Sequence, residues 1–250
     1  MKAFAMLCKV ETRLFIRDFF SCFFTLVFPL LMLVLFGGIF GNMPIYEGAA
    51  MNMMDVSVPA YTVMVIGVTG LMSLPLTLSG YQEKKIYKRF DASPAGKRNV
   101  MLAQVVINLI MTLIGIAILL IAGRLFYDIQ IKGDFIAICV CLFISITSLF
   151  SMGFLFSAIG QDSKTTTLLC YLCYFIMLFL SGATMPDMMF PDAIKRISDL
   201  LPMSYAVDLM QGVFAGDTLV MHQRELIILG IVAFVCITIG AAIYKRKDWT

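Results

Sequence analysis

Six long stretches of the chain contain no charged residue, and the charges cluster between them. The stretches hold 19 to 28 residues and cover 19–46, 56–82, 99–123, 135–161, 165–186 and 226–244. A helix needs roughly 20 apolar residues to cross a hydrocarbon core of about 30 Å. Strands of a membrane barrel need only about 10 residues and alternate polar with apolar positions. The pattern therefore predicts an all-α membrane protein with six transmembrane helices.

The composition supports the same class. Hydrophobic residues make up 60% of the chain and charged residues 14%, whereas soluble domains carry about 25% charged residues. A soluble bundle of six wholly apolar helices would lack a water-facing surface. Without a repeat or a low-complexity linker, we expect a single transmembrane domain over 1–250. Its spans are predicted at about 20–42, 57–81, 100–123, 135–160, 166–186 and 226–244.

The distribution of Lys and Arg predicts the orientation. With the N-terminus placed in the cytoplasm, 14 of the 19 basic residues fall in cytoplasmic segments and 5 in outer segments. Basic residues in short loops favour the cytoplasmic side. We therefore expect a multi-pass protein of the cell membrane with both termini in the cytoplasm.

Residues 1–18 are predicted to form an interfacial helix. At 100° per residue its four basic side chains fall within one arc, and apolar side chains cover the adjoining side. A basic stripe beside an apolar stripe suits a helix lying on anionic headgroups. A plain cytoplasmic flank of the first span is the alternative. The basic residues are Lys2, Lys9, Arg13 and Arg17.

The outer segment between the fifth and sixth spans is not a simple loop. Prolines punctuate it, and apolar residues in 187–215 follow helical spacing. Ser204 is expected to cap a second short helix that runs to about Ala215, where Gly216 ends it. We predict short outer helices that re-enter the membrane, with a surface hairpin as the alternative.

Neutral polar residues inside the spans form a candidate translocation path. Gln104, Asn108 and Thr112 are spaced i, i+4 and i+8, so they share one helix face. Helix–helix hydrogen bonds explain such residues equally well. Ser73 and Thr77 of the second span complete the candidate path.

The sequence lacks two features that would allow the chain to drive transport by itself, namely charged residues inside the spans and a phosphate-binding loop. The spans contain no charge of the kind that ion-coupled pumps use. The only Gly-Lys pair, Gly96-Lys97, is followed by Arg98 where a phosphate loop needs Ser or Thr. Energy is therefore expected from a partner. A secondary carrier and a membrane enzyme are the alternatives, and the latter lacks a catalytic constellation.

Two local patterns, together with six spans and an N-terminal helix, resemble the membrane subunits of type-2 ATP-binding-cassette exporters. After the second span, residues 83–94 (EKKIYKRFDASP) are similar to the family's charged segment ending in Ser-Pro. After the fifth span, 181–186 (SGATMP), a further proline and 201–205 (LPMSY) are similar to its Gly-x-x-x-Pro … Pro … Pro pattern. The residues carrying that outer re-entrant motif are Gly182, Pro186, Pro191, Pro202 and Tyr205.

The resemblance implies a permease that exports an amphipathic drug, antimicrobial peptide or lipid. Two such chains, as a homodimer or heterodimer in the lipid bilayer, would pair with two copies of a separate ATPase subunit, and no nucleic acid is expected as a partner. ATP and Mg would bind to that ATPase, so this chain is expected to be no enzyme by itself and to bind no cofactor or metal. The implied ATPase-coupling residues are Glu83, Lys84, Lys85, Lys88, Arg89, Pro94, Arg13 and Arg17.

Overall fold

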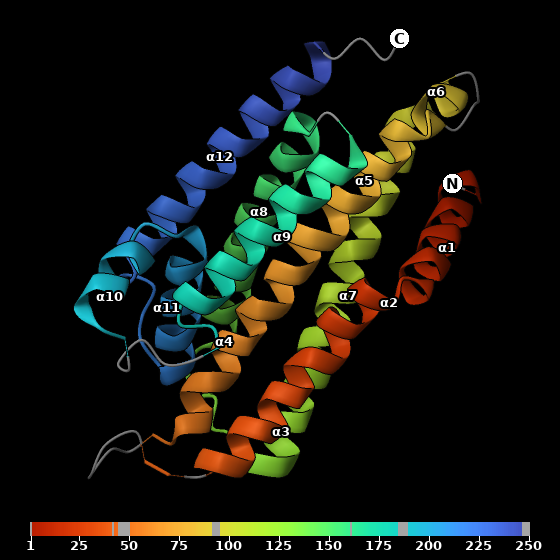
Figure 1. Cartoon of the computed structure of the whole chain (residues 1–250). Coiled ribbons are helices and arrows are strands. Elements are labelled where there is room, and N and C mark those ends of the chain that lie inside the picture. Colours follow the sequence, from red (N-terminus) through yellow and green to blue (C-terminus); the bar gives the residue numbers. More distant parts are fainter. Residues whose placement is uncertain are drawn as a thin grey trace.

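The computed structural model is all-α in the residues it describes, which are 2–41, 43–44, 51–91, 96–160, 162–184 and 190–246 (Figure 1). This confirms the predicted fold class. The helical segments are α1 Lys2–Arg17, α2 Phe19–Cys22, η1 Phe23–Val27, α3 Phe28–Phe40, α4 Met53–Gly67, η2 Val68–Ser73, α5 Leu74–Glu83, α6 Ile86–Asp91, α7 Gly96–Tyr127, α8 Phe135–Ile159, α9 Ser163–Leu180, α10 Asp192–Ser198, α11 Pro202–Ala215 and α12 Gln223–Arg246.

Six helical stretches in the described residues are long and apolar enough to cross a membrane, as the sequence predicted. Two of them are composite, since α2, η1 and α3 run on into one another, as do α4, η2 and α5. In the composite spans, η1 and η2 are π-helical segments, and each is followed within two residues by a proline, Pro29 or Pro75. A proline removes a backbone donor, and a π-bulge is one way in which a helix accommodates such a break.

The helix ends differ from the predicted span ends where local chemistry sets them. The second span begins at Met53 because the Asn52 backbone N–H donates to Asp55 Oδ2 (2.9 Å) in a capping box. The third span runs past both predicted ends, because its flanking charges join the helix at Gly96–Tyr127. The fifth ends at Leu180, whereas the prediction extended it to 186.

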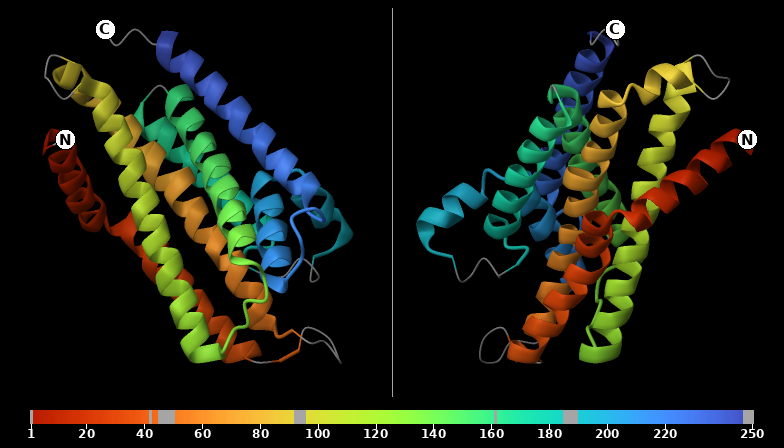
Figure 2. Two further views of the ribbon diagram at one scale, coloured as in Figure 1. Left: turned by 180° about the vertical axis from the view of Figure 1, so that it is seen from behind. Right: turned by 45° about the vertical axis from the view of Figure 1, so that its right-hand side comes forward.

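The second span forms the centre of the bundle. In its most apolar window 83% of the residues are buried, against 22% in the first and sixth spans. Figures 1 and 2 show α4 and α5 surrounded by the other long helices. Close approach against α8 depends on glycine, because a Cβ built at Gly153 would lie 1.9 Å from the Gly70 carbonyl oxygen. The central helix is therefore the element against which the others are placed.

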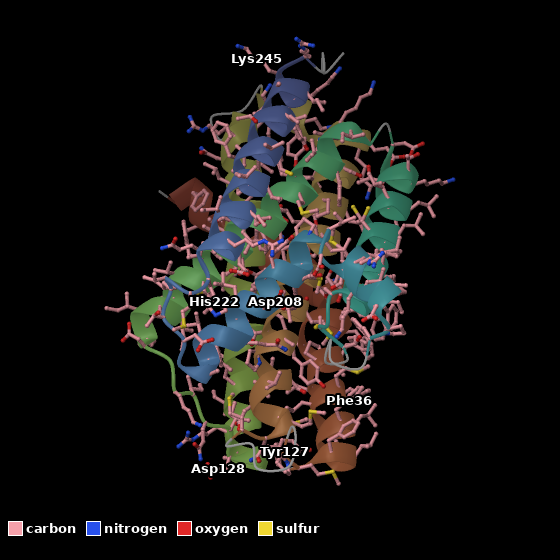
Figure 3. The ribbon with its side chains drawn as sticks, turned by 90° about the vertical axis from the view of Figure 1, so that its left-hand side faces the viewer. Phe36, Tyr127, Asp128, Asp208, His222 and Lys245 are labelled. Atoms are coloured by element: carbon pink, nitrogen blue, oxygen red, sulfur yellow. The ribbon has the colours of Figure 1, made fainter. Side chains whose placement is uncertain are left out.

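The two ends of the bundle differ in what they carry. The start of α1, the α5–α6 turn and the end of α12 lie at one end (Figure 1). Lys245 marks this end and Asp128 the opposite one in Figure 3. Segments α10 and α11 lie beside α9 and α12, partway along the bundle. The predicted outer short helices are therefore helical, although Ser204 does not cap α11: Leu201 occupies the N-cap and Ser204 Oγ bonds Ser198 Oγ (3.0 Å).

The N-terminal helix α1 is separated from the first span by a break at Asp18. Asp18 has an extended backbone (φ −80°, ψ 100°) and stands directly before α2. Beyond it α1 turns away from the bundle axis (Figure 2). It contacts α7 through a face that includes the buried Glu11 and Phe15. This elbow between α1 and α2 sets the geometry of the site described next.

Candidate functional site

The predicted coupling residues of the α5–α6 turn form an exposed, mostly basic surface, whereas those of α1 lie on a separate helix. Glu83, Lys84, Lys85 and Arg89 are exposed, and Lys88 is half-buried. Arg13 and Arg17 are exposed on α1. Pro94 lies outside the described residues. The surface is therefore accessible to a partner at the end of the bundle that carries α6.

A tight turn separates α6 from the second span. The Lys84 N–H donates to Gly80 O (3.2 Å) and the Lys85 N–H to Gln82 O (2.9 Å). Lys85 adopts φ 53°, in the left-handed region that non-glycine residues rarely occupy. The turn interrupts the helix, so α6 is a separate short element and not an extension of the span.

Four buried or half-buried polar side chains connect α1, α5, α6 and α7, and we call them the polar junction. Tyr81 Oη donates to Glu11 Oε1 at 2.8 Å, and Gln104 Nε2 reaches the same oxygen at 3.5 Å. Tyr87 Oη donates to Gln104 Oε1 at 2.7 Å. The helix α6, which carries Lys88 and Arg89, is thereby tied through Gln104 to α1.

The electrostatics of the junction centre on Glu11, whose side chain is 6% exposed. Burial raises the pKa of this carboxyl, and the hydrogen bonds from Tyr81 and Gln104 lower it in part. Burial also raises the pKa of Tyr87, so its hydroxyl keeps its proton and remains a donor to Gln104. The junction thus holds a carboxylate whose charge is only partly compensated.

A second polar chain starts one residue further along α5. Gln82 Nε2 donates to Tyr244 Oη of α12, and Tyr244 Oη lies 2.8 Å from Ser157 Oγ of α8. The Tyr244 ring stacks on Phe154 with centroids 4.7 Å apart. The last turn of α5 is therefore tied to α1 and α7 on one side and to α8 and α12 on the other.

The candidate path residues all lie inside the bundle. Gln104, Asn108 and Thr112 are at most 4% exposed, on the inward face of α7. Thr112 Oγ1 donates to Thr69 Oγ1 (2.7 Å), which is a helix–helix contact to η2. Asn108 Nδ2 donates to Gln104 O, while Asn108 Oδ1 is buried without a hydrogen-bond partner. Whether substrate passes along this face stays a prediction.

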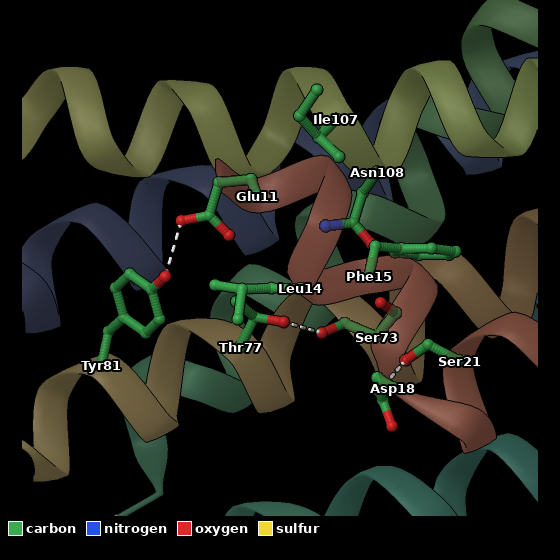
Figure 4. A pocket seen from close by; sticks show the side chains of 10 residues that line it. All are labelled: Glu11, Leu14, Phe15, Asp18, Ser21, Ser73, Thr77, Tyr81, Ile107 and Asn108. Carbon is green, nitrogen blue, oxygen red and sulfur yellow. Dashed lines mark hydrogen bonds between the residues drawn. The ribbon is translucent and has the colours of Figure 1, made fainter. Parts of the chain in front are cut away.

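Three of the five path residues line one cavity of about 180 Å³ between the α1–α2 elbow and the bundle, and we call it the elbow cavity (Figure 4). Two carboxylates face it from the elbow, while hydroxyls and an amide face it from η2, α5 and α7. Its lining residues are Glu11, Leu14, Phe15, Asp18, Ser21, Ser73, Thr77, Tyr81, Ile107 and Asn108.

The outer motif residues shape the connection from α9 to α11. Gly182 adopts φ 78° just after α9 ends. Pro191 is the N-cap of α10 and Pro202 is the first residue of α11, where a missing N–H costs nothing. Tyr205 donates to Asp199 O and lies under Arg224, whose guanidinium is 5.8 Å from the ring centroid. Pro186 lies outside the described residues.

The C-terminal end of α11 is anchored to the first turn of α4 and to the connection between α7 and α8. Gln211 Nε2 donates to Val56 O (3.2 Å), and the Lys132 N–H donates to Phe214 O (3.1 Å). Gly216 ends the helix with φ 106°, as predicted. At the other end of α11, Met203 contacts Gly67, the last residue of α4 and midway along the second span. The helix therefore runs from the start of the second span to the middle of that span.

Sequence reasoning missed Glu11, the residue that joins the junction to the elbow cavity. A signal was present: Leu7, Glu11 and Phe15 share one helix face at i, i+4 and i+8, so Glu11 is the single charge on a face that otherwise packs. Among the described residues no group of three His, Cys, Asp or Glu side chains is arranged to hold a metal ion.

Comparison with known proteins adds an independent observation. The family model described as ABC-2 type transporter matches residues 2–215, which include both the junction and the outer helices. A search of curated proteins finds no match to the chain.

Proposed function

The chain belongs to the ABC-2 type transporter family, and on that premise we propose that it is the permease subunit of an ATP-driven exporter that moves an amphipathic drug, antimicrobial peptide or lipid outward. The family is a membrane component of transport and is not catalytic by itself. With six apolar helices the chain is a multi-pass membrane protein that works with an ATP-binding-cassette ATPase.

The polar junction carries this proposal. An ATPase that closes on ATP and Mg would push on the exposed surface of Glu83, Lys84 and Arg89. This force displaces α6. The hydrogen bond from Tyr87 to Gln104 transmits the displacement to the face of α7 that also bears Asn108 and Thr112. Since a polar chain buried in low dielectric is costly to break, it moves the helices together. Rigid α7 then extends the motion to the outer end of the bundle.

The proposed assembly has two copies of this permease, or this chain with a different one, and two ATPase subunits. Large apolar side chains remain exposed along α3, α7 and α12, among them Val34, Leu125 and Phe234. Such faces suit lipid and a second permease chain. The basic surface around α6 suits the ATPase.

We place the protein in the cell membrane with both termini in the cytoplasm. The ends of the described chain, Lys2 and Arg246, lie at the end of the bundle that carries α6 (Figure 1). The excess of Lys and Arg at that end favours the cytoplasmic side.

The test uses the chain reconstituted with its ATPase in proteoliposomes. Glu83→Ala and Arg89→Ala change exposed residues, so insertion should persist, while substrate-stimulated ATPase activity should fall roughly fivefold or more, as expected for a coupling free energy. Lys195→Ala, an exposed basic residue of α10, is the matched control and should leave the activity unchanged. Full stimulation in both coupling variants would contradict the proposal.

A further inference from the structure

The elbow cavity has an unusual electrostatic lining. It contains the carboxylates of Glu11 and Asp18, and none of its ten lining residues is basic. Within the described chain, neither carboxylate forms an ion pair; Glu11 accepts from Tyr81 and Gln104, and Asp18 accepts from Ser21. The charged groups in the lining of the cavity are therefore all acidic, at the edge of an apolar bundle.

A residue that lines the same cavity carries a buried polar atom without a partner. Asn108 is 4% exposed and lines the cavity, and its Oδ1 has no hydrogen-bond partner. Buried carbonyl oxygens are nearly always paired, so an orphan is a sign of a missing donor. A donor bound between Glu11 and Asn108 would satisfy this oxygen. Carboxylate and amide oxygens accept hydrogen bonds, so the missing group is a donor and, given the two carboxylates, a cation.

The apolar part of the lining and the size of the cavity select an organic cation. Its volume of about 180 Å³ is more than ten times the roughly 10–15 Å³ that one water molecule requires. Leu14, Phe15 and Ile107 form an apolar wall beside the carboxylates. A bare metal ion gains nothing from such a wall, whereas the carbon atoms next to an ammonium group do.

A second, smaller cavity of about 60 Å³ adjoins the elbow cavity beside α2 and η2. It shares Asp18, Ser21 and Ser73 with the elbow cavity. Its remaining lining is almost entirely apolar and consists of Phe20, Val68, Met72, Leu76 and Tyr171. The polar and apolar cavities lie side by side where the first span begins, which is where the head and the tail of an amphipathic molecule would separate.

We propose that the elbow cavity binds the ammonium or guanidinium head group of an amphipathic cation that arrives from the cytoplasmic leaflet, with Glu11, Asp18 and Asn108 as its ligands. The inference rests on the proposed function, because it names a substrate class for the same permease. Glu11 belongs both to the cavity and to the polar junction, so occupation of the cavity alters the contact that ties α1 to α5 and α7. Binding is thereby linked to the elements on which the ATPase pushes.

The experiment is photolabelling of the full chain in nanodiscs, without ATPase. The probe is a decylammonium that carries a diazirine near its amine, and the matched probe is the corresponding neutral alcohol. Labelled peptides are mapped by mass spectrometry. We expect the ammonium probe to label residues 7–21 and 73–81 at least fivefold more than the alcohol does. Equal labelling by the two probes would overturn the proposal.

Variants separate charge recognition from packing. Glu11→Gln keeps an acceptor for Tyr81, and Asp18→Asn changes an exposed residue that can still precede a helix, so both should fold. Each should lower ammonium labelling several-fold and leave alcohol labelling unchanged. Asp128→Asn, an exposed carboxylate at the opposite end of the molecule, is the control. Undiminished labelling in both variants would exclude these carboxylates as ligands.

Three further outcomes test the site, and the last two separate it from the proposed function. If sodium chloride protects the cavity from labelling and choline chloride at equal strength does not, the site holds a metal ion and the proposal fails. If labelling is as expected but the reconstituted ATPase is insensitive to the permease, the site stands and the transport function fails. If labelling is absent but the coupled ATPase activity is normal, the transport function stands and the proposed binding site fails.

Discussion

Glu11 brings a carboxylate into the contact between α1 and the bundle, where water is largely excluded. Its hydrogen bonds from Tyr81 and Gln104 favour the charged form, but burial opposes it more strongly, and the pKa is raised. A buried charge such as that of Glu11 destabilises the contact between the helices. Destabilising residues of this kind are expected at functional positions, because stability and activity often oppose each other there.

The first prediction concerns Glu11→Gln. Since the folded pKa of Glu11 is raised, its contribution to stability is fully present below the ordinary pKa and is lost as the pH rises through the raised value. The Gln variant carries no such penalty, so it should unfold at a higher temperature than the wild type near neutral pH. The difference should shrink as the pH falls from about 8 to about 4, where Glu is protonated. Circular dichroism of thermal unfolding in micelles measures it; a less stable variant at high pH would show that the charged form is favoured.

The second prediction concerns the closest helix contact. A Cβ at Gly153 would meet the Gly70 backbone carbonyl, which cannot move without shifting η2. Gly153→Ala should therefore lower the free energy of unfolding by about 1–3 kcal/mol, the usual range for overpacking. Gly230→Ala is the matched control, because a Cβ there has nothing within 4 Å. Unfolding in a denaturant series compares the two, and equal stability would show that the helices separate freely.

At the scale of elements, charge-free runs were enough to find every span, because lipid excludes charge. The ends of the spans were less predictable, since Asn52 and Asp55 start one helix through hydrogen bonds that hydropathy does not register. The candidate site also has a part that the sequence predicted and a part that it did not. The basic residues near α6 stood out in the sequence, whereas the junction joins Glu11 to Gln104 across 93 positions, a pairing that only the packed bundle creates.

The third prediction tests whether α10 and α11 re-enter the membrane. Leu200 lies between them and is 79% exposed, an exposure that water would make unfavourable. If this connection lies in the hydrocarbon, Leu200→Cys in a cysteine-free background should react at least tenfold more slowly with a charged maleimide than Asp217→Cys, which is also exposed. Equal rates would place both helices in water and favour the surface hairpin.

At the scale of the whole molecule, the two ends of the bundle differ in charge as well as in the elements they carry. The sequence predicted this polarity from the excess of Lys and Arg, and the structure places α6 with the described chain ends. Every cytoplasmic contact proposed above depends on that orientation.

The fourth prediction follows from it. A protease-cleavable tag joined after Thr250 should be removed in inverted vesicles and protected in right-side-out vesicles, because the positive end remains in the cytoplasm. A tag placed in the 42–52 connection should give the opposite pattern and serves as the control. Protection of the C-terminal tag in inverted vesicles would reverse the assigned topology.

The unequal lengths of the spans have a consequence for the surrounding lipid. With 18 residues α9 reaches roughly 27 Å, whereas the 32 residues of α7 reach about 48 Å at 1.5 Å per residue. The bilayer becomes thinner beside a short span. A long span tilts, or the bilayer becomes thicker beside it, and each Å of mismatch costs a fraction of a kcal/mol. The charged residues near both ends of α7 extend past its apolar run, so tilt and protruding ends accommodate much of its length. The short α9 has no such reserve, so lipids with short tails are expected to gather beside α9, and the ring of lipid around the protein becomes uneven.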